Sequence, residues 1–150
     1  MTPTTYITSP IPRNSLSSFA SRLPEITSQL LSAAETSGFF SLTDSGISIS
    51  EIDSIFATSE RFFDLPDHAK ATVPFTHKNV GWEKEAQIRP STGTADVKES
   101  YQMQFGANME GKWIAESALP GFKSEAQTFM KKVQGVSEML MLCFRARARI

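Results

Sequence analysis

The chain has 150 residues, of which 40% are hydrophobic, and its formal net charge is −1. These values are typical of one packed globular domain, because disordered chains carry fewer apolar residues and a larger net charge. They exclude a strong global attraction to nucleic acid or to an anionic membrane, and the single cysteine, Cys143, excludes an intramolecular disulfide and favours a reducing compartment.

Residues 1–21 are rich in Ser, Thr and Pro, and they are predicted to form an extended arm with room for one short strand. No basic region followed by an apolar stretch is visible there, so no secretory signal is expected. No apolar run in the chain is long enough to span a bilayer. The sequence therefore predicts a soluble, cytoplasmic protein without a membrane partner.

A first helix is predicted over residues 24–37. Pro24 suits its first turn, where a missing N–H costs nothing, and Gly38 is a natural stop. The apolar face that supports this helix consists of Ile26, Leu30, Ala33 and Ala34. Residues 39–43 are short and apolar, which predicts a buried strand.

A second helix is predicted to begin near Ser50, where Asp53 completes a carboxylate variant of the capping box. Leu65-Pro66 ends it, because the residue before proline is pushed away from helical angles. Residues 66–71 could add one helical turn. The predicted apolar face consists of Ile52, Ile55, Phe56, Phe62 and Phe63.

The rest of the chain predicts strands and one long helix. Residues 73–87 show no clear period, and residues 89–93 are typical of a loop. Residues 100–105 alternate apolar and polar side chains, which predicts a half-buried strand. A long helix is predicted to start near Phe122, with an apolar stripe of Ala126, Phe129, Met130, Val133, Leu140, Met141 and Phe144. This order predicts a mixed α/β (α+β) fold.

The residues indicate no metal site. The chain has two histidines, His68 and His77, and neither is followed two residues later by Asp. A two-His-one-carboxylate iron site needs three ligands on one side of the metal. Both histidines are therefore interpreted as surface or turn residues.

No catalytic residue is indicated either. Cys143 lies on the apolar stripe of the last helix and is predicted to be a buried, inert thiol. The chain shows no Gly-x-Ser-x-Gly elbow and no phosphate-binding glycine loop. Four acidic residues of the polar segments are predicted to form solvated surface: Glu83, Glu85, Asp96 and Glu99.

The last residues alternate Arg with Ala, at Arg145, Arg147 and Arg149. Three arginines supply only a weak, salt-sensitive attraction to phosphates. No nucleic-acid partner is therefore predicted, although strongly salt-dependent binding would indicate one.

A series of short motifs runs from about residue 24 to residue 144. The first is Ala34-Glu35-Thr36-Ser37-Gly38-Phe39-Phe40-Ser41-Leu42, followed by Gly46-Ile47. The second is Phe62-Phe63-Asp64-Leu65-Pro66 with Lys70, followed by Gly81-Trp82. The later motifs are Asp96-Val97-Lys98-Glu99-Ser100-Tyr101, Trp113 and Leu119-Pro120-Gly121-Phe122.

In this order and spacing, the motifs resemble the N-terminal region of the isopenicillin N synthase-like family of Fe(II)/2-oxoglutarate-dependent dioxygenases. The family reads A-x-x-x-G-F-F-x-(V/L), F-F-x-L-P-x-x-x-K and D-x-K-E-(S/T)-(Y/F) at these places. Each motif is weak alone, and the series is specific. One departure is Asp44-Ser45-Gly46-Ile47, which lacks the histidine usual in the family.

The resemblance implies a full-length enzyme that couples 2-oxoglutarate decarboxylation at Fe(II) to oxidation of a small organic molecule. It implies that this region buttresses a double-stranded β-helix, a jelly roll that is largely absent from this chain. The family's His-x-Asp, distal His and cosubstrate-binding Arg-x-Ser come after the long helix. The chain alone is therefore expected to bind no cofactor and to be inactive.

Three segments are expected: an arm (1–21), a non-haem dioxygenase N-terminal domain (22–144) and an atypical basic tail (145–150). The family continues its long helix with Phe-Ala-Arg, whereas this chain reads Phe144-Arg145-Ala146-Arg147. The sequence after Phe144 therefore suggests a frame shift or a truncation. The resemblance assigns Trp82, Tyr101 and Met103 to the substrate mouth, while core packing remains the alternative role for these side chains. The alternative function is a stand-alone, non-catalytic binding or regulatory domain, whose partner covers an exposed apolar face.

Overall fold

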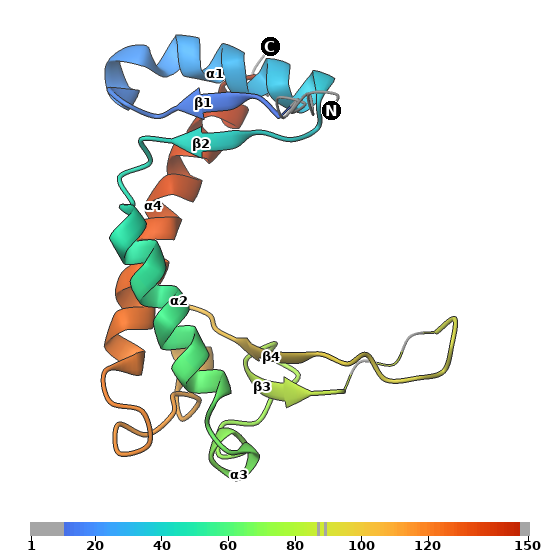
Figure 1. Cartoon of the computed structure of the whole chain (residues 1–150). Coiled ribbons are helices and arrows are strands. Elements are labelled where there is room, and N and C mark those ends of the chain that lie inside the picture. The colour runs from blue at the N-terminus through green and yellow to red at the C-terminus, as the bar shows by residue number, and fades with distance from the viewer. Residues whose placement is uncertain (1–10, 87, 89, 148–150) are drawn as a thin grey trace, which may run out of the picture. The chain divides into compact units, whose positions relative to one another are not determined.

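The computed structural model describes residues 11–86, 88 and 90–147, which form helices and two small two-stranded sheets (Figure 1). This mixture confirms the predicted α+β class in its coarse form. The elements in chain order are β1 (Arg13–Ser15), α1 (Phe19–Thr36), β2 (Ser41–Thr43), α2 (Ile49–Phe63), α3 (Asp67–Lys70), β3 (Gly81–Lys84), β4 (Glu99–Gln102), the 3₁₀ turn η1 (Ala107–Met109) and α4 (Phe122–Arg147).

The chain divides into two compact units. The first combines the described residues up to Ile49 with those from Met130 onward. In it, β1 and β2 pair in parallel, with Asn14 opposite Leu42, and α1 lies alongside them (Figure 1). The buried core of this unit consists of Leu16, Ile26, Leu30 and Cys143. Cys143 is fully buried, as predicted.

Helix α1 begins earlier than predicted. It starts at Phe19, so Pro24 lies inside the helix and not in its first turn. The carbonyl of Ser18 opens the helix by accepting hydrogen bonds from the N–H groups of Ser21 and Arg22. Phe19 and Leu23 pack against the core of the unit, so their burial offsets the one backbone donor that proline removes.

The end of α1 follows the prediction more closely. The N–H of Gly38 bonds back to the carbonyl of Ala33 at 3.1 Å, and Gly38 has a positive φ of 72°. The strand predicted over residues 39–43 is shorter, at Ser41–Thr43, and Phe39 is 69% exposed. The prediction of a buried Phe39 is therefore wrong, because it precedes the paired residues.

The second unit comprises residues 50–129. Strands β3 and β4 pair antiparallel, and the buried core consists of Phe62, Val73, Ile114, Leu119 and Phe122. The ring of Phe62 stacks on Phe122 with centroids 5.1 Å apart. The starts of α2 and α4 confirm their predicted positions near Ser50 and Phe122, whereas β3 lies in a segment where no strand was predicted.

The predicted apolar face of α2 is only partly buried. Phe62 is 1% exposed, whereas Phe56 is 70% exposed, and Ile52 and Phe63 are each 37% exposed. At about 100° per residue, the exposed three gather roughly 120° around the helix from the buried side at Thr58 and Phe62. The prediction merged two faces into one, and only one of them meets the core.

Candidate functional site

The three side chains predicted to line a substrate mouth lie on or next to one face of the β3–β4 hairpin. Trp82 stands directly opposite Tyr101 in the ladder, and residues directly opposite each other share a face. Met103 follows two residues after Tyr101, so it continues the same side. All three are partly buried and pack against the core of the second unit. Their packing role is therefore visible, and contact with a substrate stays a prediction.

Tyr101 packs against two aromatic rings of the core. Its ring lies 4.5 Å from Phe62 and 5.7 Å from Phe122, between centroids. Its hydroxyl donates a hydrogen bond to the carbonyl of Lys112. Burial raises the pKa of the phenol above its ordinary value. The phenol therefore stays neutral, and its ring packs against Phe62 and Phe122.

Trp82 makes a hydrogen bond to a charged side chain. Its indole Nε1 donates a hydrogen bond of 2.6 Å to Oε1 of Glu99. Glu99 lies two residues before Tyr101 in β4, which places it on the same face of the hairpin. Glu99 was predicted to form part of the solvated surface. That assignment is wrong, because the side chain is 25% exposed and has two partners.

The second partner of Glu99 is Lys70, at the end of α3. Its Nζ lies 2.6 Å from the same Oε1 atom and donates to the carbonyl of Phe63 at 2.7 Å. Asp67 lies 3.4 Å away, and the Lys70 side chain is only 4% exposed. A buried ammonium is stable only when it is paired and hydrogen-bonded, and this one meets both conditions.

The surrounding charges favour the ionised forms. Desolvation by itself would raise the pKa of Glu99, but hydrogen bonds from Lys70 and Trp82 outweigh it and leave this pKa below its ordinary value. A hydrogen bond from Lys84 lowers the pKa of Asp67. The same contact, at 2.8 Å, raises the pKa of Lys84. This face of the hairpin thus carries the aromatic pair Trp82 and Tyr101 and, next along the strands, the charged pair Lys84 and Glu99.

Gly81 explains why the hairpin can sit where it does. Its φ is 105°, and an added Cβ would lie 2.3 Å from the carbonyl oxygen of Pro74. That close approach lets the Trp82 N–H donate to the carbonyl of Val73 at 2.7 Å. Both residues of Gly81-Trp82 are therefore needed. The glycine allows the close approach to the backbone of Pro74, and the tryptophan side chain packs against the core.

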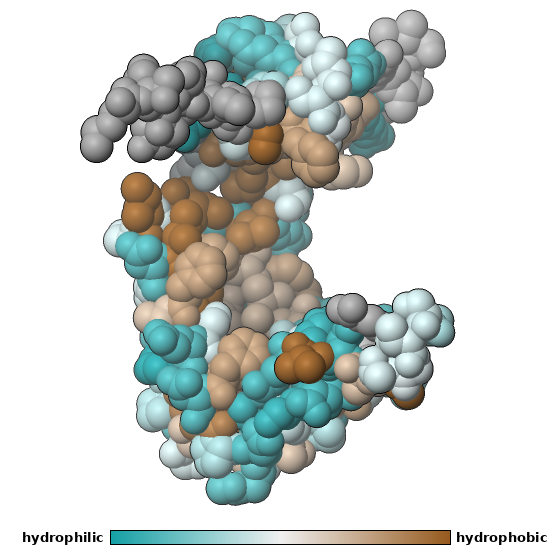
Figure 2. Space-filling view, turned by 45° about the vertical axis from the view of Figure 1, so that its right-hand side comes forward, coloured by the Kyte–Doolittle hydropathy of each residue, from teal (hydrophilic) through white to brown (hydrophobic). Residues whose placement is uncertain are grey.

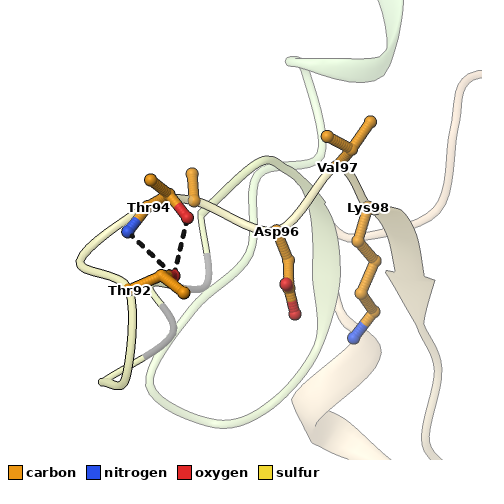
Figure 3. A pocket seen from close by; sticks show the side chains of 6 residues that line it. Thr92, Thr94, Asp96, Val97 and Lys98 are labelled. Atoms are coloured by element: carbon orange, nitrogen blue, oxygen red, sulfur yellow. Dashed lines mark hydrogen bonds between the residues drawn. The ribbon is translucent and has the colours of Figure 1, made fainter.

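A hollow of about 370 Å³ lies in the loop between β3 and β4 (Figure 3). Its charged lining is Asp96 and Lys98, and Thr92 and Thr94 bond to each other at its rim. Every lining residue comes from this one loop, and Val97 is 97% exposed. Because no side chains converge on it from different elements, it is not a candidate active site.

The residues that the structure describes do not form an iron site. Among the described residues, no three His, Cys, Asp or Glu side chains gather as a metal ligand set. His68 in α3 and His77 between α3 and β3 are both exposed. The letters Arg-x-Ser occur before the long helix, at residues 13–15 and 89–91. The first of these is strand β1, and Arg89 lies outside the described residues.

Comparison with known proteins identifies the family. The profile described as non-haem dioxygenase in morphine synthesis N-terminal matches residues 11–119. The chain belongs to this family. Relatives of the chain are named 2-oxoglutarate-dependent dioxygenases, and together with the family match they confirm the resemblance seen in the motifs.

The similar proteins agree with this assignment. The 2-oxoglutarate-dependent dioxygenase frbA of Dothideomycetidae sp. is 30% identical over a match of 124 residues, and the match covers 71% of this chain and 36% of that protein. The 2-oxoglutarate-dependent dioxygenase ecdK of Aspergillus rugulosus is 28% identical, over 75% of this chain and 40% of that protein. The chain thus spans about two fifths or less of these relatives.

A solved structure shares the fold. A 2OG-Fe(II) oxygenase family protein from Caulobacter crescentus superposes with a TM-score of 0.72 at 21% identity. The match covers 95% of this chain and 50% of that chain. In the described part of this chain, no helix is both long and apolar enough to cross a membrane.

Proposed function

We propose that this chain is the N-terminal domain of an Fe(II)- and 2-oxoglutarate-dependent oxidoreductase that acts on a small organic molecule. The observation that carries the proposal is the family match over residues 11–119. The names of frbA and ecdK support the cosubstrate, and the name of a third relative, the 2-oxoglutarate-Fe(II) type oxidoreductase ppzD of Metarhizium rileyi, supports the metal. The motif series favours the isopenicillin N synthase-like branch.

We further propose that the chain alone turns nothing over and binds neither cofactor. The sequence contains no His-x-Asp, and its two histidines, His68 and His77, lie exposed. In a full-length parent, the iron ligands and the cosubstrate residues would come from the part that follows the long helix. This domain would buttress the jelly roll there, and Trp82, Tyr101 and Met103 would contact the substrate. The lone buried Cys143 favours a cytoplasmic location.

The direct test is an assay of the purified chain with Fe(II), 2-oxoglutarate and oxygen. We expect no succinate above a reaction that lacks the protein. Calorimetry with Fe(II) present should also detect no binding of 2-oxoglutarate. Oxygen-dependent succinate formation by the pure chain would overturn the proposed inactivity, and the family assignment would stand.

The existence of a full-length parent enzyme is tested by sequencing the transcript. Sequencing across the Phe144 codon and onward should reveal a frame that encodes a His-x-Asp, a distal His and an Arg-x-Ser. The enzyme read from that frame should form succinate in the same assay. A transcript without such a frame would remove the enzyme proposal for this protein and favour the second candidate.

The second candidate is a stand-alone binding or regulatory domain, and it is favoured by apolar side chains at the surface. Hydrophobic residues are visible among hydrophilic ones on the face drawn in Figure 2. On α2, Ile52, Phe56 and Phe63 are exposed, and on α4 so are Val133 and Met141. Exposed apolar patches mark interaction sites. A monodisperse monomer without a bound partner, measured by light scattering, would argue against this candidate.

A further inference from the structure

One carboxylate oxygen organises the charged end of the hairpin. Oε1 of Glu99 accepts a hydrogen bond from the indole of Trp82 and another from the ammonium of Lys70, each at 2.6 Å. The same ammonium lies 5.6 Å from the centroid of the Trp82 ring. The three side chains therefore contact one another pairwise, and each contact restrains the other two.

Lys70 is the fixed point of this group. Its Nζ has three hydrogens and three acceptors, namely Glu99, Asp67 and the carbonyl of Phe63, at 2.6, 3.4 and 2.7 Å. The carbonyl of Phe63 belongs to the last residue of α2, so the ammonium is anchored to backbone as well as to side chains. Because the side chain is 4% exposed, water cannot readily replace these partners.

Trp82, by contrast, needs an external restraint. An indole has one polar group, its N–H, which donates and cannot accept. The packing of Trp82 against the core leaves the side chain only partly buried. A partly buried ring can still turn about its side-chain bonds, so the hydrogen bond from the indole N–H to Glu99 restrains that rotation.

We propose that Glu99, held in place by Lys70, is a positioning residue for Trp82 and sets the orientation in which the hairpin presents the indole. The meaning of this orientation rests on the proposed function, in which Trp82 contacts the substrate of the full-length enzyme. Glu99 itself then needs no contact with substrate. The restraint can be measured without iron, cosubstrate or substrate, so its failure is distinguishable from failure of the proposed function.

The experiment records the indole N–H resonances of the full chain by ¹⁵N-edited NMR. The chain has two tryptophans, and Trp82→Phe assigns its signal by the peak that disappears. In Glu99→Gln, the Trp82 indole proton should move upfield, because a neutral amide is a weaker acceptor than a carboxylate. The Trp113 signal serves as the internal reference.

Glu83→Gln is the matched control. Glu83 lies in the same hairpin on the opposite face, where it accepts a hydrogen bond of 3.1 Å from Ser100. The same change of charge there should leave the Trp82 indole signal unmoved. If Glu83→Gln and Glu99→Gln moved it equally, the effect would come from net charge and the positioning role would be overturned.

The role of Lys70 is tested through its effect on the indole proton of Trp82, which Lys70 does not bind. Lys70→Met should move the Trp82 indole signal in the same direction as Glu99→Gln, and Lys70→Arg should restore most of the shift because it keeps a donor to Glu99. An unmoved indole signal in a folded Glu99→Gln variant would overturn the proposal, because packing alone would then orient the ring.

A titration of the unchanged chain decides the matter if the variants fail to fold. As pH falls and Glu99 is protonated, the Trp82 indole signal should move before the backbone amides lose their dispersion. The charged groups that face Glu99 are Lys70 and Lys84, with Asp67 next to both. An indole signal that stays fixed until the whole chain unfolds would overturn the proposal.

Discussion

The two units of the chain stabilise their interiors differently. The first buries aliphatic side chains and one thiol, with Ile26, Leu30 and Cys143 fully enclosed. The second buries stacked aromatic rings around Phe62 and also a charged side chain, Lys70. A buried charge costs free energy unless it is paired, whereas a buried aliphatic side chain needs only close packing. The interior of the second unit therefore depends on the pairing of Lys70 as well as on packing.

The largest effect is expected at Phe62. Phe62→Ala removes the ring at the centre of the aromatic cluster and should lower the free energy of unfolding by about 3–5 kcal/mol. Phe56→Ala, on the exposed side of the same helix, should change it by less than about 1 kcal/mol. Urea unfolding followed by circular dichroism measures both values. Equal losses would contradict the observed division of α2 into two faces.

The second effect tests the buried charge. Lys70→Met should lower the free energy of unfolding by about 3 kcal/mol, because it leaves the Glu99 carboxylate without its cation. The double variant Lys70→Met with Glu99→Gln should be more stable than Lys70→Met alone. Thermal unfolding of the four chains makes the comparison. A double variant that is less stable than both single variants would show that the two side chains act independently.

The third effect tests the close approach at Gly81. Gly81→Ala should destabilise by roughly 2–4 kcal/mol, since the new Cβ would clash with Pro74 as well as force a strained φ. Gly93→Ala also places a side chain at a positive φ, of 66°, but meets nothing within 4 Å, so it should cost about 1 kcal/mol. Similar losses in the two variants would mean that the backbone contact with Pro74 does not constrain the hairpin.

The smallest effect is expected in the loss of folding stability as pH falls, which compares one acidic residue from each unit. Hydrogen bonds lower the pKa of Glu99 in the second unit, against its desolvation, and a hydrogen bond from Arg22 lowers the pKa of Glu25 in the first. Each pair contributes stability above the unfolded-state pKa, and this stability is lost as pH falls through the folded-state pKa. The Glu25 side chain is 52% exposed against 25% for Glu99, so solvent screens its pair more strongly, and Glu99 should contribute more.

Chemical unfolding between pH 7 and pH 3 checks this expectation. The unchanged chain should lose stability in acid, and Glu99→Gln should flatten the loss more than Glu25→Gln does. A larger flattening in Glu25→Gln would reverse the comparison between the two units.

Local signals allowed the helices to be predicted from the sequence. Gly38 ends α1 through a backbone bond within five residues, and Pro66 ends α2 by restricting the residue before it. The motif series from Ala34 to Phe122 also indicated the family that the profile match confirms. Such features can be read in a sequence because their partners lie a few residues apart.

The candidate face could be predicted only in part. Trp82 and Tyr101 were selected by resemblance, and the structure places them opposite each other in the ladder. Glu99 was missed, although its period-two spacing from Tyr101 would have placed it on the same face. Its partner Lys70 lies far from it in the chain, on another element, so no local pattern could have joined the two.

The sequence by itself determined where α2 and α4 begin, that the thiol of Cys143 is buried, and to which family the chain belongs. Only the tertiary structure decided that α1 runs through Pro24, that Phe56 stays exposed while Phe62 is buried, and that Glu99 holds both Lys70 and Trp82. Capping and periodicity act between near neighbours. Burial of a given face, and the partner of a given charge, depend on segments that meet only when the chain folds.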